Sequence, residues 1–318
     1  MNWKKKLATY TSLAALATLI IHIINKLVYF MATIENLLGK KEGLYYDWKF
    51  GKIFYTKNGS GKPILLIHDL DACSSEYEWN KIVSTLSKTN TVYTLDLLGC
   101  GKSDKPHFTY TNFLYVQLIT DFIKNVISEK TDVIVTGNSS SFVLMACHND
   151  HTIIDKILLI NPPSISSISK VPTKRTKLLK LLINIPFIGT LLFNILHNKQ
   201  SIEETFMTEY FYNPQFVTED MIKTYYESSQ VSKTQSKFLF ASIKGKYTTA
   251  NVIECLTHTD NSIFILVGNG NPVYREYAIQ YQTYTPSIEI QTIEKTKYLP
   301  QLEAPEKVLE QIKILFEL

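Results

Sequence analysis

Short apolar runs alternate with helix-like segments along most of this chain. After a predicted hairpin around Gly51, the expected strands are Pro63–His68, Thr91–Asp96, Asp132–Gly137, Lys156–Ile160, Ser262–Val267 and Ile288–Ile293. The expected helices between and after them are Trp79–Leu86, Phe113–Ile127, Ser140–Asn149 and Ala304–Leu318. Short apolar strands alternating with helices are typical of a mostly parallel sheet covered on both faces. The sequence therefore predicts an α/β fold.

The alternation stops for about a hundred residues in the second half of the chain. Residues 162–261 contain helical stretches and no convincing strand, and this insertion is too long for an ordinary connection. We therefore predict a core of residues 42–161 and 262–318 with a helical cap, residues 162–261, over one edge of the sheet. Within the cap, Leu178–Leu196 is very apolar. We expect a buried helix pair there, with a second membrane span as the alternative.

The amino-terminal segment is long and apolar enough to cross a membrane. Three lysines, Lys4 to Lys6, precede the uncharged run Leu7–Ile24, which as a helix would rise about 27 Å. We predict a membrane anchor within residues 1–41; an interfacial helix, a cleaved signal or a docked soluble helix are the alternatives. By the positive-inside rule, the lysines on either side of the run slightly favour a domain on the external side of the membrane. Four free cysteines instead favour a reducing compartment. The side of the membrane stays open.

Composition narrows the functional classes. A formal net charge of +4 over 318 residues is too small to indicate nucleic-acid binding. The four cysteines show neither C-x-x-C spacing nor a metal-ligand pattern. We therefore expect no bound metal, no organic cofactor and no nucleic-acid partner.

A serine-rich turn is the strongest chemical motif. The strand ending at Thr136 leads directly into Gly137-Asn138-Ser139-Ser140-Ser141, and an apolar helix follows. A serine in such a strand-turn-helix is held in a strained conformation with its hydroxyl exposed at the edge of the sheet. The small residues Gly137 and Ser141 flank Ser139 at the positions where strand and helix approach closely. Ser139 is therefore the candidate nucleophile, and a simple helix N-cap is the alternative.

Three further segments sharpen this interpretation. His68-Asp69-Leu70 follows a predicted strand, Asp96–Ser103 reads D-L-L-G-C-G-K-S, and Leu299–Glu306 reads L-P-Q-L-E-A-P-E. With the serine turn, they make residues 42 to 318 resemble the capped branch of the α/β-hydrolase family.

The resemblance implies a role for each matching residue. Ser139 would be the nucleophile, and the backbone N–H groups of Ser140 and Leu70 would form the oxyanion hole. His68 and Asp96 would fix loops and take no part in the chemistry. The site would lie beneath the cap.

The sequence departs from the family pattern at the positions of the other catalytic residues. Asn271 stands where the family has its acid, in Gly268-Asn269-Gly270-Asn271, and Tyr298 stands where it has its histidine. Another acid position used in the fold holds Asn161, and Asp69 replaces the glycine beside the oxyanion donor. Substitute bases would be His107, His148, His151, or Tyr298 activated by Lys297, with surface or loop roles expected for each.

These departures leave three functional hypotheses. The first is a membrane-anchored protein descended from a serine ester or acyl hydrolase, with weak or lost activity, that binds a small apolar or ester-like ligand under the cap. The second is an active ester hydrolase using Ser139 with an unorthodox base. The third is a non-catalytic ligand-binding or interaction module.

Overall fold

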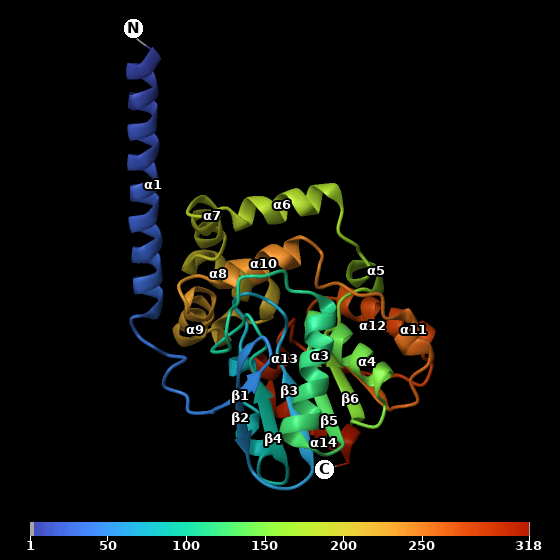
Figure 1. Ribbon diagram of the computed structural model, residues 1–318. Helices are drawn as coiled ribbons and strands as arrows, with labels where there is room; N and C mark the ends of the chain where they lie inside the picture. Colours follow the sequence, from blue (N-terminus) through green and yellow to red (C-terminus); the bar gives the residue numbers. More distant parts are fainter. Residues whose placement is uncertain (1–2, 318) are drawn as a thin grey trace.

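A single eight-stranded sheet organises the protein, and the computed structural model describes residues 3–317 of it (Figure 1). The strand order is β1-β2-β4-β3-β5-β6-β7-β8, and only the β1–β2 and β2–β4 pairs are antiparallel. The strands are β1 Leu44–Trp48, β2 Gly51–Asn58, β3 Pro63–Ile67, β4 Thr91–Leu95, β5 Thr131–Thr136, β6 Ile154–Ile160, β7 Ile263–Gly268 and β8 Glu289–Ile293. The mostly parallel sheet predicted from the sequence is confirmed. Met1, Asn2 and Leu318, at the ends of the predicted anchor and closing helix, lie outside the described residues.

Helices cover both faces of the sheet. The core is flanked by α2 Val83–Leu86, α3 Asn112–Phe122, α4 Ser140–Asn149, α12 Val273–Tyr284, α13 Pro300–Glu303 and α14 Pro305–Phe316. The predicted helix Trp79–Leu86 is wrong in its first half. There the chain forms a 3₁₀ turn over Glu76–Trp79 and becomes α-helical only at Val83.

Alternate side chains of the central strands pack into opposite layers. Leu65 and Ile67 of β3 belong to the apolar cluster that includes α3 and α4, whereas Ile64 and Leu66 belong to the cluster on the α14 face. All five residues of β3 are buried, as expected for a central strand covered on both sides. Because Ile67 is paired with Val135, the loops that follow β3 and β5 leave the same edge of the sheet side by side.

The segment between β6 and β7 forms helices and contains no strand in the described chain. Its helices are α5 Ile165–Ile168, α6 Lys174–Asn184, α7 Ile188–Leu196, α8 Lys199–Thr205, α9 Glu219–Gln230, α10 Ser236–Lys244 and α11 Ile253–Thr257. The apolar stretch Leu178–Leu196 is not one helix, because α6 and α7 meet at a 102° bend. It is also not a buried pair, since most of its leucines and isoleucines are exposed. Exposed apolar residues of α6, α7 and their connection are Leu178, Leu179, Leu181, Leu182, Ile185, Phe187, Ile188, Leu192, Ile195 and Leu196.

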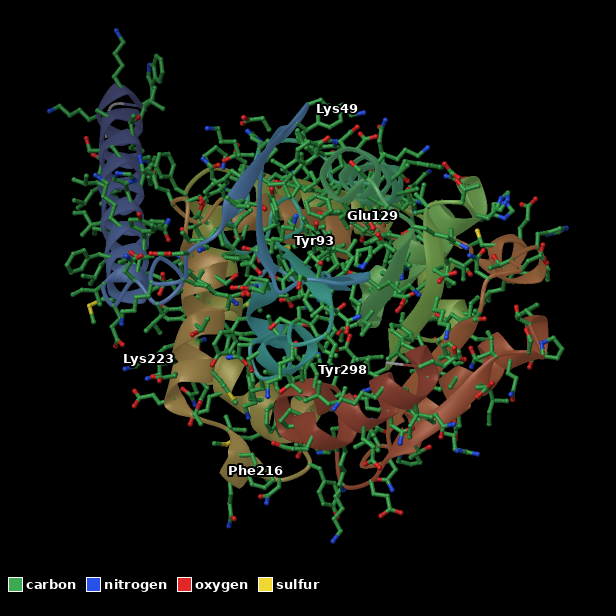
Figure 2. All side chains as sticks on the ribbon, turned by 90° about the horizontal axis from the view of Figure 1, so that it is seen from below. Lys49, Tyr93, Glu129, Phe216, Lys223 and Tyr298 are labelled. Carbon is green, nitrogen blue, oxygen red and sulfur yellow. The ribbon has the colours of Figure 1, made fainter. Side chains whose placement is uncertain are left out.

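The amino-terminal helix α1, Trp3–Thr33, stands away from the body of the molecule (Figure 1). Residues 3–20 of this helix are exposed. This part of the helix projects beyond the cap (Figure 1), and its side chains point outward on all sides (Figure 2). Near its end, the Asn25 side chain donates to the Phe187 carbonyl over 3.1 Å and accepts from Asn194 over 2.9 Å. Among the described residues, α1 is the one helix that by itself has the length and apolarity of a membrane span. Signal sequences share these properties.

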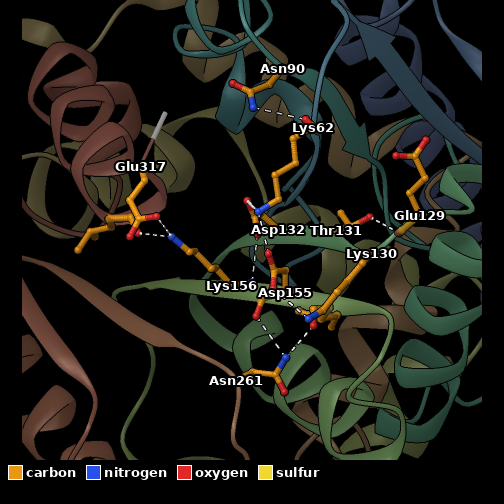
Figure 3. A network of polar contacts seen from close by, with 12 residues as sticks. Lys62, Asn90, Glu129, Lys130, Thr131, Asp132, Asp155, Lys156, Asn261 and Glu317 are labelled. Carbon is orange, nitrogen blue, oxygen red and sulfur yellow. Dashed lines mark hydrogen bonds and ion pairs between the residues drawn. The ribbon is translucent and has the colours of Figure 1, made fainter.

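Charged residues form a network of ion pairs at the edge of the sheet where the parallel strands begin (Figure 3). The ammonium of Lys62 lies 2.8 Å from both the fully buried carboxylate of Asp132 on β5 and the partly exposed carboxylate of Asp155 on β6. Lys130 pairs with Asp155 at 3.0 Å. This network belongs to the scaffold, because it lies at the start of the parallel strands and the candidate site lies at their end.

Candidate active site

The turn after β5 differs from the expectation that Ser139 occupies the strained position. The strand ends at Thr136, and the next residue, Gly137, has φ of +57°. Ser139 lies in a 3₁₀ turn with φ −66° and ψ −17°, an unstrained right-handed conformation. The positive φ falls on the residue that tolerates it without steric cost. The sharp reversal therefore comes two residues earlier than predicted.

The serines of this turn hold the backbone together. Ser139 is fully buried and its hydroxyl donates to the His68 carbonyl over 2.7 Å. The N–H of Ser140 donates to the Gly137 carbonyl, so the predicted oxyanion donor is used within the turn. The Ser141 hydroxyl donates to the Asn138 carbonyl over 3.0 Å. Both the Ser139 hydroxyl and the Ser140 N–H are therefore engaged with backbone carbonyls.

Asp69 connects the loop after β3 to the elbow and to the late loop. One oxygen of its carboxylate accepts the backbone N–H of Asn138 over 2.7 Å and the Asn138 side-chain amide over 3.1 Å. The other oxygen accepts the hydroxyl of Tyr298 over 2.7 Å. Asp69, which replaces the family's glycine beside the oxyanion donor, thus lies at the centre of the site.

The space in front of Gly137 is filled by these same groups. A methyl carbon placed on Gly137 would lie 2.0 Å from the Tyr298 hydroxyl oxygen and 2.6 Å from the nearer Asp69 carboxylate oxygen. Both distances are far shorter than a van der Waals contact. Gly137, Asp69 and Tyr298 therefore form one closely fitted unit in which position 137 has no room for a side chain.

Burial dominates the electrostatics of this unit. It raises the pKa of Asp69 to about 6, although hydrogen bonds from Tyr298 and Asn138 oppose the shift. Glu78 is also buried and accepts the Asp69 N–H over 3.1 Å. Burial and the neighbouring Asp69 carboxylate raise the pKa of Glu78 well above its ordinary value. Burial likewise raises the pKa of Tyr298 well above 10, so at neutral pH the phenol keeps its proton, donates a hydrogen bond to Asp69 and does not act as a base.

His68 and Asp96 hold loops. His68 accepts the Leu97 N–H at Nε2 over 3.0 Å, and its Nδ1 contacts the Asp69 carbonyl at 2.6 Å. Burial lowers the pKa of His68 to about 4, so the ring is neutral and donates from Nδ1. The Asp96 carboxylate accepts the N–H groups of Glu76 and Lys102.

The two asparagines at the acid positions have different surroundings. Asn161 donates to the carbonyls of Lys297 and Tyr298, both over 2.9 Å, and accepts the Gly268 N–H over 3.1 Å, which fixes the loop that carries Tyr298. Asn271 accepts the Val273 N–H over 3.2 Å at the start of α12. Neither is in a hydrogen bond with the Tyr298 hydroxyl.

A cavity of about 300 Å³ adjoins this unit beneath the cap. Its lining residues are Asp71, Cys73, Leu196, His197, Ser201, Ile202, Thr205, Tyr210, Tyr225, Phe240 and Lys244. The Tyr210 ring stacks on Tyr298 with centroids 5.4 Å apart, so the cavity and the elbow share a wall. Leu70, the other predicted oxyanion donor, is buried in the loop beside it.

Sequence reasoning missed two features of this region. The first is Gly137 as the strained residue, for which a signal existed: among the five turn residues, it alone is a glycine, directly after the strand. The second is the grouping of Asp71, Cys73 and His197, which no sequence spacing shows because the cap brings His197 to the other two. The remaining candidate bases are elsewhere: His148 and His151 are exposed, and His107 stacks on Phe238.

The fold agrees with comparison to known proteins. A family model described as the alpha/beta hydrolase family matches residues 64–311. The chain therefore belongs to the α/β-hydrolase family.

The similarity to individual proteins covers a short segment or is low in sequence identity. A 2-hydroxy-6-oxo-6-(2'-aminophenyl)hexa-2,4-dienoic acid hydrolase from Metapseudomonas resinovorans is 35% identical over 86 residues, 27% of this chain and 29% of the relative. The chain thus matches about three-tenths of that relative's length. A serine hydrolase involved in carbazole degradation superimposes with a TM-score of 0.71 at 16% identity, covering 87% of this chain and 98% of the other. A membrane phospholipase A does so with 0.68 at 16%, covering 99% and 98%. These two likenesses show the shared fold.

Proposed function

We propose that this protein is a membrane-anchored member of the α/β-hydrolase family that has lost serine hydrolysis and binds a small ligand beneath its cap. The observation that carries the proposal is Gly137 at the strained elbow, facing the Asp69 carboxylate.

The elbow defines where a nucleophile would have to be. In this fold the nucleophile occupies the strained strand-to-helix turn, and the N–H of the next residue stabilises the oxyanion. Here those positions belong to Gly137 and Asn138. Gly137 offers no hydroxyl, and the Asn138 N–H is already bound to the Asp69 carboxylate. A negative charge thus lies where a hydrolase would stabilise one that develops during the reaction.

The other two catalytic positions support the same conclusion. Tyr298 replaces the histidine base, and its hydroxyl donates a hydrogen bond to Asp69. Asn271 replaces the acid. Loss of a complete serine triad lowers turnover by a factor of order 10⁶ in a well-studied protease. All three positions are substituted in this protein, so we expect hydrolysis to be negligible.

The rival hypothesis is an active hydrolase that uses Ser139. Nucleophilic serines need a base within hydrogen-bond reach, and the Ser139 hydroxyl instead donates to the carbonyl of His68. The neutral His68 ring has both nitrogens engaged with backbone groups. This geometry favours a structural role for Ser139.

Restoring the catalytic groups tests the proposal. The variant Gly137→Ser, Tyr298→His, Asn271→Asp, Asp69→Gly supplies the serine, base and acid and clears the oxyanion hole. We expect it to gain hydrolysis of a p-nitrophenyl ester, and the matched variant that keeps Gly137 to stay inactive. Equal activity in both variants would contradict the assignment of Gly137 to the nucleophile position.

The cavity supports a binding role. Its volume suits a small molecule, and it combines aromatic walls with a few polar groups, as ligand sites do. We propose a small apolar or ester-like ligand.

Membrane attachment is the second part of the proposal. The freely exposed part of α1, Trp3–Ile20, would span about 27 Å as a helix, close to the thickness of a bilayer core. Below it, α6 lies crosswise to α1 at the top of the cap (Figure 1). Its apolar residues are exposed beside Lys174, Arg175 and Lys177. Leucines with flanking cations suit the surface of an anionic bilayer, so we infer that the cap faces the membrane.

Two fluorophore positions test this orientation. Leu181 on α6 and Ile314 on α14 are 63% and 61% exposed, so labels on Leu181→Cys and Ile314→Cys start from matched accessibility. The four native cysteines are buried. In vesicles, nitroxide lipids should quench the label at 181 strongly and the label at 314 weakly. Equal quenching would contradict the orientation, and release of the protein from membranes by a mild wash would contradict the anchor.

A further inference from the structure

Three side chains of different chemistry converge in the cavity beneath the cap. The carboxylate of Asp71, the thiol of Cys73 and a ring nitrogen of His197 all lie within 4.8 Å of one another. Asp71 and Cys73 come from the loop after β3, and His197 is the residue directly after α7 in the cap. We propose that these residues bind a divalent cation of the zinc class, a site that the sequence did not predict.

The ligand set matches the preference of such an ion. Zinc binds cysteine sulfur at about 2.3 Å and histidine nitrogen at about 2.0 Å, so tetrahedral ligand atoms lie roughly 3.5 Å apart. The groups therefore need to close by up to about 1.3 Å, which side-chain rotation can supply. A thiolate, a carboxylate and a neutral imidazole together carry two negative charges, which a divalent cation cancels in this buried place.

His197 is already oriented as a metal ligand. Its Nδ1 lies 3.1 Å from the carbonyl of Phe193, and the ring is stacked on Phe193 and packed edge-on against Phe240. A backbone carbonyl that accepts a hydrogen bond from Nδ1–H leaves Nε2 free, which is the usual outer-shell arrangement of ligating histidines.

Cys73 supplies the proton that binding would release. The Cys73 thiol is buried, and an ordinary cysteine thiol is mostly protonated at neutral pH. A bound cation replaces that proton, which passes to solvent, and the sulfur becomes a thiolate ligand. Three protein ligands leave a fourth position open, and it faces the cavity, where water or an oxygen of a ligand completes the tetrahedron.

The test uses untagged full-length protein in detergent and Co²⁺ as a spectroscopic substitute for Zn²⁺. We expect one Co²⁺ to bind per chain, with a thiolate-to-cobalt charge-transfer band and the release of one proton. Added Zn²⁺ should displace the Co²⁺ and remove the band. Cys73→Ser should abolish the band and His197→Ala should weaken Co²⁺ binding at least tenfold. The matched controls are Cys255→Ser and His258→Ala, which alter a buried cysteine and a histidine outside the site and should change nothing.

Thermal unfolding shows whether each variant is folded and, separately, whether Zn²⁺ stabilises it. Zn²⁺ should raise the unfolding midpoint of the wild type and of both controls, and should not raise that of a folded Cys73→Ser or Asp71→Asn variant. Absence of the band in the wild type, or its persistence in Cys73→Ser, would overturn the proposal. Loss of the cation site would leave the proposed loss of hydrolysis untouched, because the restored-triad experiment does not involve these residues.

Discussion

At the residue scale, Asp69 is the side chain on which the site depends. It is 5% exposed, carries a carboxylate beside Glu78, and is held by one phenol and two N–H donors. Its pKa of about 6 in the folded protein exceeds the value near 3.8 expected when unfolded. The folded state therefore binds a proton more tightly than the unfolded state between these two values.

The sign of the pH dependence follows from that difference. Stabilisation by the protonated carboxyl is fully present below about pH 4 and is lost as the pH rises through 6, by up to about 3 kcal/mol. Asp69→Asn keeps an acceptor and removes the titration. We expect the wild-type thermal midpoint to fall by several °C relative to this variant between pH 4 and pH 7. If the midpoints of the wild type and the variant changed equally over that range, the raised pKa of Asp69 would be contradicted.

Gly137 gives a second prediction at this scale. Gly137→Ala places a methyl group at positive φ and against the Tyr298 hydroxyl, so we expect a loss of about 2–4 kcal/mol of stability. In a Tyr298→Phe background the hydroxyl is absent, and the same substitution should cost less. Chemical denaturation of the four proteins measures this coupling. A cost that is the same in both backgrounds would show that the two residues do not compete for one space.

At the scale of elements, the residues that stabilise the sheet and those of the candidate site lie at opposite edges of it. Its starting edge carries the ion network around Asp132, and its final edge carries the elbow, the Asp69 loop and the cap. The buried Asp132 carboxylate depends on Lys62, whereas Asp155 is partly exposed and has two lysine partners.

Removing one partner of the buried pair should therefore be costly. Lys62→Met leaves Asp132 unpaired, and we expect a loss of about 2–4 kcal/mol. The control Lys130→Met removes only a contact to Asp155 and should cost less than about 1 kcal/mol. Urea denaturation compares them. In Asp132→Asn protein the cost of Lys62→Met should shrink, and an unchanged cost would contradict the role of this pair.

The elements that the sequence predicted well are those whose signal is local. Pro63–His68 and Asp132–Gly137 are apolar runs that only a buried strand explains, and both are strands within one residue. The turn after β5 was harder, because the serine motif drew attention to Ser139, whereas strand register and the tolerance of glycine for positive φ place the reversal at Gly137. The grouping of Asp71, Cys73 and His197 could not be predicted from the sequence, since it depends on how the cap folds over the loop after β3.

At the scale of the whole molecule, three parts have separate tasks. The α/β core holds the elbow and the Asp69 unit, the cap closes a cavity against it, and α1 with the α6–α7 face would place that cavity near a bilayer. A ligand that dissolves in membranes would then reach the cap from the lipid side. The central claim is that no nucleophile operates at the elbow.

A fluorophosphonate probe tests that claim most directly, because it labels only activated serines. We predict that the full-length wild type stays unlabelled, while a known serine hydrolase in the same tube is labelled. The restored-triad variant should become labelled at position 137. Rapid labelling of the wild type that disappears in Ser139→Ala would contradict the account and establish Ser139 as a working nucleophile.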